Sequence, residues 1–283
     1  MDDNRSIAFQ GMRGAYSEQA CREKMPDYRV YPCKTFEDVF SAVEEGLCRY
    51  GMLPVENSMA GVVSDSYDLL AVHRLSVVGE YFLHVRHCLL ANPAATLPQI
   101  TTVFSHPQAL AQCRSFIRRF GWNHLSVYDT AGSAAELAQR AIPQEAAIAS
   151  ELCASLYGLT VLQRDIQDSR MNTTRFLVIG REPCSPDPSE PCKTSVLFTV
   201  RDIPAALYKC LGGFATNGIN LTRLESRPVP GKQWTYNFYL DFQGHPEEER
   251  CRLALEELRF FTTSCKVLGC YPEGTKPQWD ETP

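Results

Sequence analysis

A polar stretch that runs into an apolar one carries the residue types best suited to binding a small anion. It reads Asp168-Ser-Arg-Met-Asn-Thr-Thr-Arg-Phe176 and continues into Leu177-Val-Ile-Gly180. Arginine can bind a carboxylate through two parallel hydrogen bonds, and a neighbouring threonine hydroxyl can donate one to a second polar group. Thr173, Thr174 and Arg175 are therefore candidate site residues, although the polar start of an ordinary buried strand can look the same.

A second candidate segment is Pro54-Val-Glu-Asn-Ser58, followed by Gly61. It ends an expected strand, and open α/β sheets bind ligands at the carboxyl ends of their strands. Asn57 and Ser58 are the candidate ligand-binding residues. The alternative is that one of them only caps a helix.

The third segment is Phe104-Ser-His-Pro-Gln-Ala-Leu110. Ser105 is a plausible N-cap because Pro107 suits the first helical turn, and Gln108 follows on that turn. His106 could act as a general base, but no order of Ser or Cys, His and Asp supports a hydrolase. A capped helix with a surface histidine is the favoured reading of His106 alone.

The fourth segment is Gly11-Met-Arg-Gly-Ala-Tyr-Ser-Glu18, between an expected strand and an expected helix. Free amides at a helix start attract anions, so Gly14 is a candidate anion contact; a simple strand–helix turn is equally compatible. The segment matches neither the dinucleotide-binding nor the P-loop glycine pattern. No metal cluster, nucleophile or cofactor loop accompanies the four segments, so we expect no cofactor and no metal. They suit a small polyanion whose reaction needs positioning and one weak acid.

The elements that must position these residues change character along the chain. Four prolines fall within Arg181–Cys192, which predicts a stiff, extended linker. Before it, strands and helices alternate, which predicts an α/β region with mainly parallel sheets. The expected strands are 6–10, 50–55, 101–104, 125–128, 146–149 and 175–179, with β-rich 75–91 as a crossover between lobes. The expected helices are 15–25, one capped by Thr35, 107–120, 133–141 and 151–157.

After the linker the order of expected elements is βαββαβ, a ferredoxin-like arrangement. The expected strands are 195–200, 219–227, 234–242 and 265–270, and the expected helices are 204–217 and 247–261. The alternating strand 234–242 has the pattern to pair with another copy.

Composition narrows the function classes. The chain has 283 residues, 44% hydrophobic and 22% charged, and a net charge of −5. These values indicate a globular protein and disfavour general nucleic-acid binding. No apolar run approaches the ~20 residues of a membrane span, and the N-terminus lacks a signal-peptide pattern, so we expect a cytoplasmic protein. The twelve cysteines show no zinc or redox spacing. We expect small, reduced, buried side chains, with Cys184 and Cys192 exposed in the linker.

At these segments the chain resembles the prephenate dehydratase family. Asn172-Thr-Thr-Arg-Phe176 is similar to the family's Thr-Arg-Phe signature, and the other three segments are similar to further family segments in the same order. Asn220-Leu-Thr-Arg-Leu-Glu-Ser-Arg-Pro228 resembles the Glu-Ser-Arg-Pro motif of its C-terminal ACT regulatory domain. The resemblance covers about residues 6–275.

The resemblance implies a two-lobed catalytic region like a type II periplasmic binding protein, with the active site between the lobes. It places the catalytic region at 1–182, with lobe one at 1–78 and 170–182 and lobe two at 79–169. A linker at 183–193, an ACT domain at 194–275 and a tail at 276–283 complete the expected organisation.

The resemblance also implies roles for individual residues. Thr174 would donate to the departing hydroxyl of prephenate, and Arg175 would bind a carboxylate. Residues expected to orient the substrate are Asn57, Ser58, Ser105, Gln108, Thr173 and Gly14. L-Phenylalanine would inhibit by binding the ACT domain, and the expected effector residues are Asn217, Gly218, Asn220, Leu221, Glu225 and Ser226. The family's first ACT helix begins Gly-Ala-Leu, whereas this chain has Ala205-Ala-Leu207, which bears on the strength of that binding.

The sequence leaves two alternatives open. An arogenate dehydratase performs the same elimination on a substrate with an amino group in place of the keto oxygen, and no residue decides between the two. A non-catalytic anion-binding protein with an amino-acid sensor domain has a similar composition and element order. A homodimer or homotetramer through the ACT domains is expected by analogy.

Overall fold

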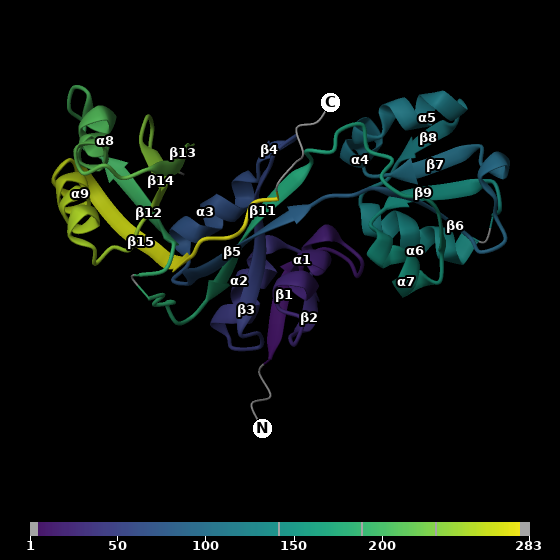
Figure 1. Cartoon of the computed structure of the whole chain (residues 1–283), viewed down its shortest axis with the longest axis horizontal. Coiled ribbons are helices and arrows are strands. Elements are labelled where there is room, and N and C mark those ends of the chain that lie inside the picture. Colours follow the sequence, from purple (N-terminus) through teal and green to yellow (C-terminus); the bar gives the residue numbers. More distant parts are fainter. Residues whose placement is uncertain (1–4, 141, 188, 230, 278–283) are drawn as a thin grey trace. The chain divides into compact units, whose positions relative to one another are not determined.

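The computed structural model describes residues 5–140, 142–187, 189–229 and 231–277, which form two compact units (Figure 1). Unit 1 consists of Met1–Val63, Phe82–Phe176 and Lys276–Pro283, and unit 2 of Ser64–Tyr81 and Leu177–Thr275. Two strands, β5 (Ser76–His84) and β11 (Thr173–Gly180), contribute residues to both units. Neither unit is therefore a single continuous stretch of chain.

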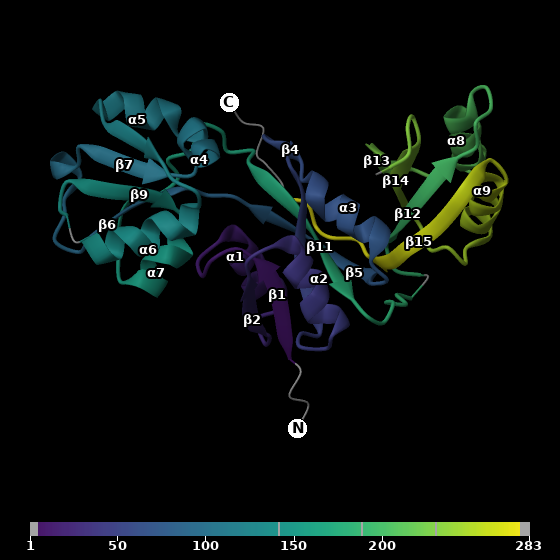
Figure 2. The same ribbon diagram turned by 180° about the vertical axis from the view of Figure 1, so that it is seen from behind.

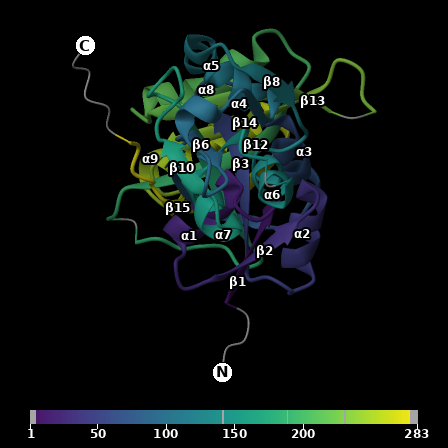
Figure 3. The same cartoon turned by 90° about the vertical axis from the view of Figure 1, so that its right-hand side faces the viewer.

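The N-terminal part of unit 1 alternates strands and helices, as predicted. Its elements are β1 (Ser6–Gln10), α1 (Tyr16–Lys24), β2 (Arg29–Cys33), α2 (Phe36–Glu44), β3 (Tyr50–Asn57) and β4 (Gly61–Val62). β1 runs parallel to β2 and β3, while β4 folds back antiparallel on β3. β1, β2 and α2 form the purple end of the ribbon in Figure 3. The start of β11 lies beside the end of β3, where the Ser58 amide donates to the Thr173 carbonyl at 2.9 Å.

The start of α2 confirms a predicted helix cap. The Asp38 amide donates to Thr35 Oγ1 at 3.1 Å, and the Thr35 amide donates to an Asp38 carboxylate oxygen at 3.0 Å. This reciprocal pair satisfies two amides that a helix start otherwise leaves without partners.

The rest of unit 1 is a five-stranded sheet with helices on both faces (Figure 2). Its elements are β6 (Cys88–Ala91), the 3-10 turn η1 (Leu97–Gln99), β7 (Thr102–Ser105), α4 (Pro107–Gln112), α5 (Arg114–Phe120), β8 (Asn123–Ser126), α6 (Thr130–Arg140), β9 (Glu145–Ala149), α7 (Glu151–Tyr157) and β10 (Thr160–Gln163). The strand order is β10-β6-β9-β7-β8. β7 runs parallel to β8 and β9, but β6 runs antiparallel to β9 and β10.

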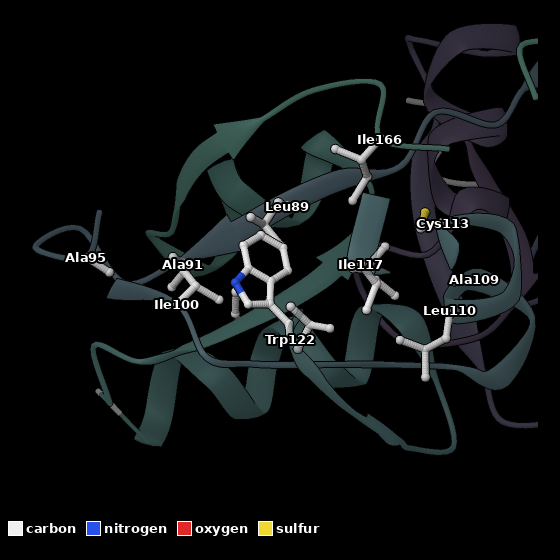
Figure 4. Close-up of a cluster of buried hydrophobic side chains, with 13 residues drawn as sticks. Leu89, Ala91, Ala95, Ile100, Ala109, Leu110, Cys113, Ile117, Trp122 and Ile166 are labelled. Atoms are coloured by element: carbon white, nitrogen blue, oxygen red, sulfur yellow. The ribbon is translucent and has the colours of Figure 1, made fainter. Parts of the chain in front are cut away.

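Strand alternation builds the two cores of this sheet. Leu89 and Ala91 of β6 join a buried cluster with α4, α5 and Trp122, which Figure 4 shows. Cys88 and Leu90, one position away, join the opposite cluster with α6 and α7. Successive side chains of a strand point to opposite faces, so a nearly continuous apolar run is what a sheet covered on both faces requires.

Unit 2 contains the ferredoxin-like order that the sequence predicts. Its elements, besides parts of β5 and β11, are α3 (Ser64–Val72), β12 (Cys192–Val200), α8 (Ala206–Thr216), β13 (Leu221–Pro228), β14 (Tyr236–Gln243), α9 (Glu249–Phe260) and β15 (Thr262–Pro272). The antiparallel sheet has the order β13-β14-β12-β15. Side chains of α8 and α9 pack on one face, where Phe198, Phe214 and Phe242 are fully buried.

The other face of this sheet packs on α3 and β5 within unit 2. Tyr239 donates its hydroxyl to the Tyr67 carbonyl at 2.6 Å, and Lys193 forms a buried ion pair with Glu80 at 2.7 Å. A Cβ built on Gly269 would lie 1.9 Å from the Val77 carbonyl oxygen, so the two backbones touch. The sheet is therefore covered on both faces.

The structure corrects several sequence predictions. The helix expected at 107–120 is two helices, because the chain turns at Cys113. The elements β2, β4, α3, β10 and η1 were not predicted. Cys192 was expected to be exposed, but it begins β12 and is only 4% exposed.

Candidate functional site

Unit 1 contains a cavity of about 1370 Å³. Its wall is built where strands end and helices begin: Gln10 ends β1 and Gly11 follows it, Asn57 ends β3, and Thr35 caps α2. Thr174 and Phe176 line it from β11. The cavity therefore collects residues from all four candidate segments of the sequence, and the third of them, Phe104–Leu110, reaches it through α4.

Only some of the predicted substrate-binding residues line this cavity. Asn57, Gln108 and Thr174 do. The cavity lining does not include the remaining predicted residues, which are Ser58, Ser105, Thr173, Gly14 and Arg175.

Asn57 has a fixed orientation. Its Oδ1 accepts from the amides of Met59 at 3.0 Å and Ala60 at 2.9 Å, in the turn between β3 and β4. Its Nδ2 must therefore point the other way, where it donates to Asn172 Oδ1 at 2.8 Å and to Thr174 Oγ1 at 2.9 Å. Because Thr174 Oγ1 accepts this bond, its own hydrogen remains available to donate.

Four residues of the cavity wall were given no role from the sequence: Tyr16, His87, Gln112 and Asn172. Gln112 Oε1 accepts from Asn172 Nδ2 at 3.0 Å and lies 2.8 Å from His87 Nε2. The other ring nitrogen, Nδ1, lies 2.7 Å from the Tyr16 hydroxyl. Gln112 follows Gln108 by one helical turn, and this spacing could have predicted that both side chains line the same site. The only sequence signal for His87 is that it is a polar residue within an apolar stretch.

Two predicted substrate contacts instead hold the backbone. Ser58 Oγ donates to the Met171 carbonyl at 2.6 Å and accepts from the Thr173 amide at 2.9 Å. Ser105 is buried and donates to the Ile148 carbonyl at 2.6 Å. It is not the N-cap of α4: that residue is His106, whose Nδ1 accepts from the Gln108 amide at 3.2 Å.

Thr173 differs from these serines. Its Oγ1 is buried and has no hydrogen-bond partner within the described part of the chain. A buried hydroxyl without a partner is costly, so this atom remains a candidate for a ligand contact.

The Gly14 amide has a partner within the chain, which argues against the predicted anion contact. It donates to Glu18 Oε2 at 2.8 Å, and that fully buried carboxylate is paired with Arg13 and Arg22. A Cβ on Gly14 would lie 2.5 Å from Cys153 Sγ, and its φ is +91°. The glycine is therefore needed for close packing against α7.

Strand alternation also separates Arg175 from the cavity. The lining residues of this strand and its approach are Asn172, Thr174 and Phe176, two residues apart. The side chain between them points to the opposite face, and Arg175 is only 7% exposed. The predicted carboxylate contact by Arg175 therefore has no support from this geometry.

Other groups give the cavity a positive character. Arg13 and Lys34 line it, and so do residues at the first turns of α1, α2 and α6. Helix N-termini carry partial positive charge and unsatisfied amides. Asp129 is an acidic group on the wall, and its Oδ1 accepts from the Ala131 amide at 3.0 Å.

The predicted effector residues lie on one side of unit 2, between the end of α8 and the middle of β13. Asn217 and Gly218 form the turn after α8, where Asn217 Nδ2 donates to the Gly213 carbonyl at 2.7 Å. Asn220 Nδ2 donates to Gln243 Oε1 at 2.8 Å. Leu221, Glu225 and Ser226 follow on β13.

Within the described residues, neither a candidate membrane span nor a candidate metal site is present. No helix there is both long and apolar enough for a membrane crossing. No group of three or more His, Cys, Asp or Glu side chains there could hold a metal ion.

Comparisons with known proteins agree with this geometry. The family model described as prephenate dehydratase matches residues 7–184. Arogenate dehydratase 2 of Petunia hybrida is 43% identical over 280 residues, which cover 94% of this chain and 71% of that protein. A bifunctional N-acyl-homoserine lactone acylase/prephenate dehydratase of Komagataeibacter europaeus is 43% identical over 273 residues, which cover 96% of this chain and 97% of that protein.

A solved structure is similar over nearly the whole chain. Prephenate dehydratase of Arthrobacter aurescens, in complex with L-Phe, has a TM-score of 0.87 at 31% identity and covers 95% of this chain and 90% of its own. The family model spans more than half of the chain, and each of these relatives is at least 31% identical and matches at least 94% of it. The chain belongs to the prephenate dehydratase family, whose members are lyases.

Proposed function

We propose that the protein converts prephenate to phenylpyruvate by decarboxylative dehydration. The observation that carries this proposal is the hydrogen bond from Asn57 Nδ2 to Thr174 Oγ1 at 2.9 Å. It occupies the threonine oxygen as an acceptor and leaves the hydroxyl hydrogen to donate to a group in the cavity. A site of this kind offers one weak acid held in a fixed orientation.

The reaction needs little more than that. Prephenate is a dicarboxylate with a ring hydroxyl, and forming an aromatic ring drives the elimination. The bond between the ring and its carboxylate breaks, the electron pair enters the ring, CO2 leaves and the hydroxyl departs. A threonine ionises far above neutral pH, so Thr174 shares its proton with the departing oxygen in a preorganised site. The net reaction consumes one proton, which solvent supplies.

The cavity also suits the rest of this substrate. Arg13, Lys34 and the helix starts attract two carboxylates, and Phe176 and Val85 offer apolar surface to the ring. Gln108 and Asn57 are proposed to orient the substrate. Ser58 and Ser105 act on it through the backbone they hold.

A Thr174→Ala variant tests this function. We expect kcat for phenylpyruvate formation to fall by about 100-fold or more, with a modest change in KM, because the lost donor acts on the departing group. Thr174→Ser keeps the hydroxyl and is the matched control. Near-normal kcat in Thr174→Ala would exclude the proposed role.

Arogenate is the second candidate substrate, and Asp129 favours it. Arogenate carries a cationic amino group where prephenate has a keto oxygen, and a carboxylate on the cavity wall attracts a cation. Measuring kcat/KM on both substrates decides between them. If Asp129 recognises the amino group, Asp129→Asn lowers kcat/KM for arogenate and leaves that for prephenate unchanged.

The ferredoxin-like part of unit 2, 192–272, is proposed to be an ACT domain that binds L-phenylalanine and inhibits the enzyme. The support is its element order, the segment Glu225-Ser-Arg-Pro228 on β13 and the relative solved with L-Phe. Isothermal titration with L-phenylalanine tests this; an absence of saturable heat would remove the claim. We also propose a homodimer or homotetramer through these domains, which light scattering after gel filtration would measure.

A further inference from the structure

His87 is a buried residue of the cavity wall that the proposed reaction does not use. Its side chain is 2% exposed, and it lies in the short connection between β5 and β6. Its backbone is fixed on both sides: the amide donates to Gln167 Oε1 at 2.8 Å, and the carbonyl accepts from the Ile166 amide at 3.1 Å. The imidazole is therefore held in one place by its own chain.

A chain of hydrogen bonds joins His87 to Thr174, and its direction is set at one end. The amides of Met59 and Ala60 hold Asn57 Oδ1, so Asn57 Nδ2 donates to both Asn172 Oδ1 and Thr174 Oγ1. With its oxygen accepting, Asn172 donates through Nδ2 to Gln112 Oε1 at 3.0 Å.

The same logic fixes the tautomer of His87. Gln112 Oε1 can only accept, so the hydrogen between it and His87 Nε2, 2.8 Å away, belongs to the imidazole. Nδ1 is then the acceptor, and the Tyr16 hydroxyl, which also lies 3.0 Å from the Arg86 carbonyl, gives its one hydrogen to this nitrogen at the shorter distance of 2.7 Å. Burial lowers the pKa of His87, which favours this neutral form.

We propose that His87 is a positioning residue that fixes the hydrogen-bond direction of Gln112 and Asn172 and thereby the orientation of the Thr174 hydroxyl. In the other tautomer, Nε2 would face Gln112 Oε1 without a hydrogen between them, and the Gln112 amide would turn over. The NH2 group of Gln112 would then face the NH2 group of Asn172. If the Asn172 amide also turned over, its NH2 group would face the NH2 group of Asn57, whose orientation is fixed. The Nε2–H tautomer alone lets every member of the chain bond. This inference rests on the proposed role of Thr174.

Two variants separate positioning from structure. A glutamine at 87 can place an NH2 group near the Nε2 position, whereas an asparagine is too short to reach Gln112. We expect His87→Gln to retain kcat within about fivefold of the wild type. We expect His87→Asn to lose about 10- to 100-fold in kcat with KM within about threefold, because a small misorientation of a reacting group costs this much. Equal losses in both variants at equal thermal stability would overturn the proposal.

A spectroscopic measurement tests the tautomer directly in the unsubstituted protein. Long-range 1H–15N spectra of protein labelled at histidine distinguish the two tautomers, with His87→Gln used for assignment. We expect His87 to be in the Nε2–H form at pH 7; the Nδ1–H form would overturn the proposal. A wild type inactive on both prephenate and arogenate would overturn the proposed function and this inference together. An active wild type with unchanged kcat in His87→Asn would overturn the inference alone.

Discussion

Arg227 of β13 donates two hydrogen bonds to the carboxylate of Asp68 on α3, at 2.8 and 3.2 Å, and a third to Ser64 Oγ at 2.9 Å. The pair is partly buried and bidentate, the geometry in which an ion pair contributes most. Arg227 belongs to the segment that resembles the effector motif. The strand that carries that motif is therefore joined to the first turns of a helix outside the ferredoxin-like sheet.

Removing one side of this pair should destabilise unit 2. We expect Asp68→Ala to lower the free energy of unfolding by about 1 kcal/mol, because a half-buried guanidinium loses a two-bond partner. The control is Glu256→Ala, which removes an exposed pair with Arg252 on α9 and should cost much less. Chemical denaturation measures both. Equal effects would mean that the Arg227 pair is no stronger than a surface pair.

Gly14 should not tolerate a side chain. In Gly14→Ala the new Cβ would lie 2.5 Å from Cys153 Sγ, and the alanine would have to adopt a φ of +91°. We therefore expect the free energy of unfolding to fall by about 2–4 kcal/mol. Gly158 has a φ of +68° with nothing within 4 Å, and Gly158→Ala should show the backbone cost alone, about 1 kcal/mol. Adding Cys153→Ala to Gly14→Ala should recover part of the difference. No recovery in thermal or denaturant unfolding would argue against the clash.

Ala205 precedes α8 with a φ of +57°, in the left-handed region that favours glycine. The family resemblance places glycine at this position. We expect Ala205→Gly to raise the free energy of unfolding by up to about 1 kcal/mol. If the methyl group also hinders the effector, L-phenylalanine should bind the variant more tightly in the same titration. A destabilised variant would show that the methyl makes useful contacts.

Stability should fall on the acidic side of neutrality. Burial holds the pKa of His87 below its usual value, and it also lowers the pKa of His84. Below a pH of about 6.5 the unfolded chain takes up protons that the folded chain does not, so the free energy of unfolding decreases as the pH falls. His87→Gln should flatten this slope by at most about 1.4 kcal/mol per pH unit. Denaturant unfolding at pH 7.5 and 5.5 tests it, and an unchanged slope would contradict a depressed pKa of His87.

The cysteines should be nearly inert in the folded protein. Burial raises the pKa of the thiols of Cys88, Cys153 and Cys251 to about 11, and Cys192 is likewise buried, with a pKa of about 12. Cys184 and Cys265 are half-buried. Burial raises the pKa of the Cys265 thiol, so a thiol reagent should modify Cys184 first. We expect Cys184→Ser to remove the fast phase and unfolding to reveal the remaining thiols. A fast phase that persists in this variant would assign it to another cysteine.

Local patterns were predictable from the sequence, and long-range partners were not. The capping box of Thr35 and Asp38 involves residues three apart, and the structure has it as predicted. The helix predicted at 107–120 breaks because Asp168, 53 residues from Ser115, accepts from the Ser115 amide. The periodicity of a helical pattern contains no information about a partner so far away along the chain.

The site shows the same division. The sequence predicted Asn57 and Thr174 as site residues, because hydrogen-bonding side chains near the ends of expected strands can be recognised from the order of residues. It missed His87, whose partner Gln112 is 25 residues away. It also assigned an anion to Gly14, although the carboxylate that accepts from that amide belongs to Glu18, a local partner four residues further on. The assignment of Arg175 rests on its residue type and on the resemblance, and alternation along β11 turns its side chain away from the residues that line the cavity.

The buried pair of Lys193 and Glu80 limits how this enzyme could be divided. Glu80 also accepts from the Gly274 amide at 2.8 Å, so one carboxylate on β5 is satisfied by groups at both ends of the ferredoxin-like segment. A chain truncated at the proline-rich segment would lose both the cation that pairs with Glu80 and the sheet that covers this part of β5. The two parts are not interchangeable modules. A fusion that exchanges the C-terminal part for that of a relative would have to supply a lysine that pairs with Glu80.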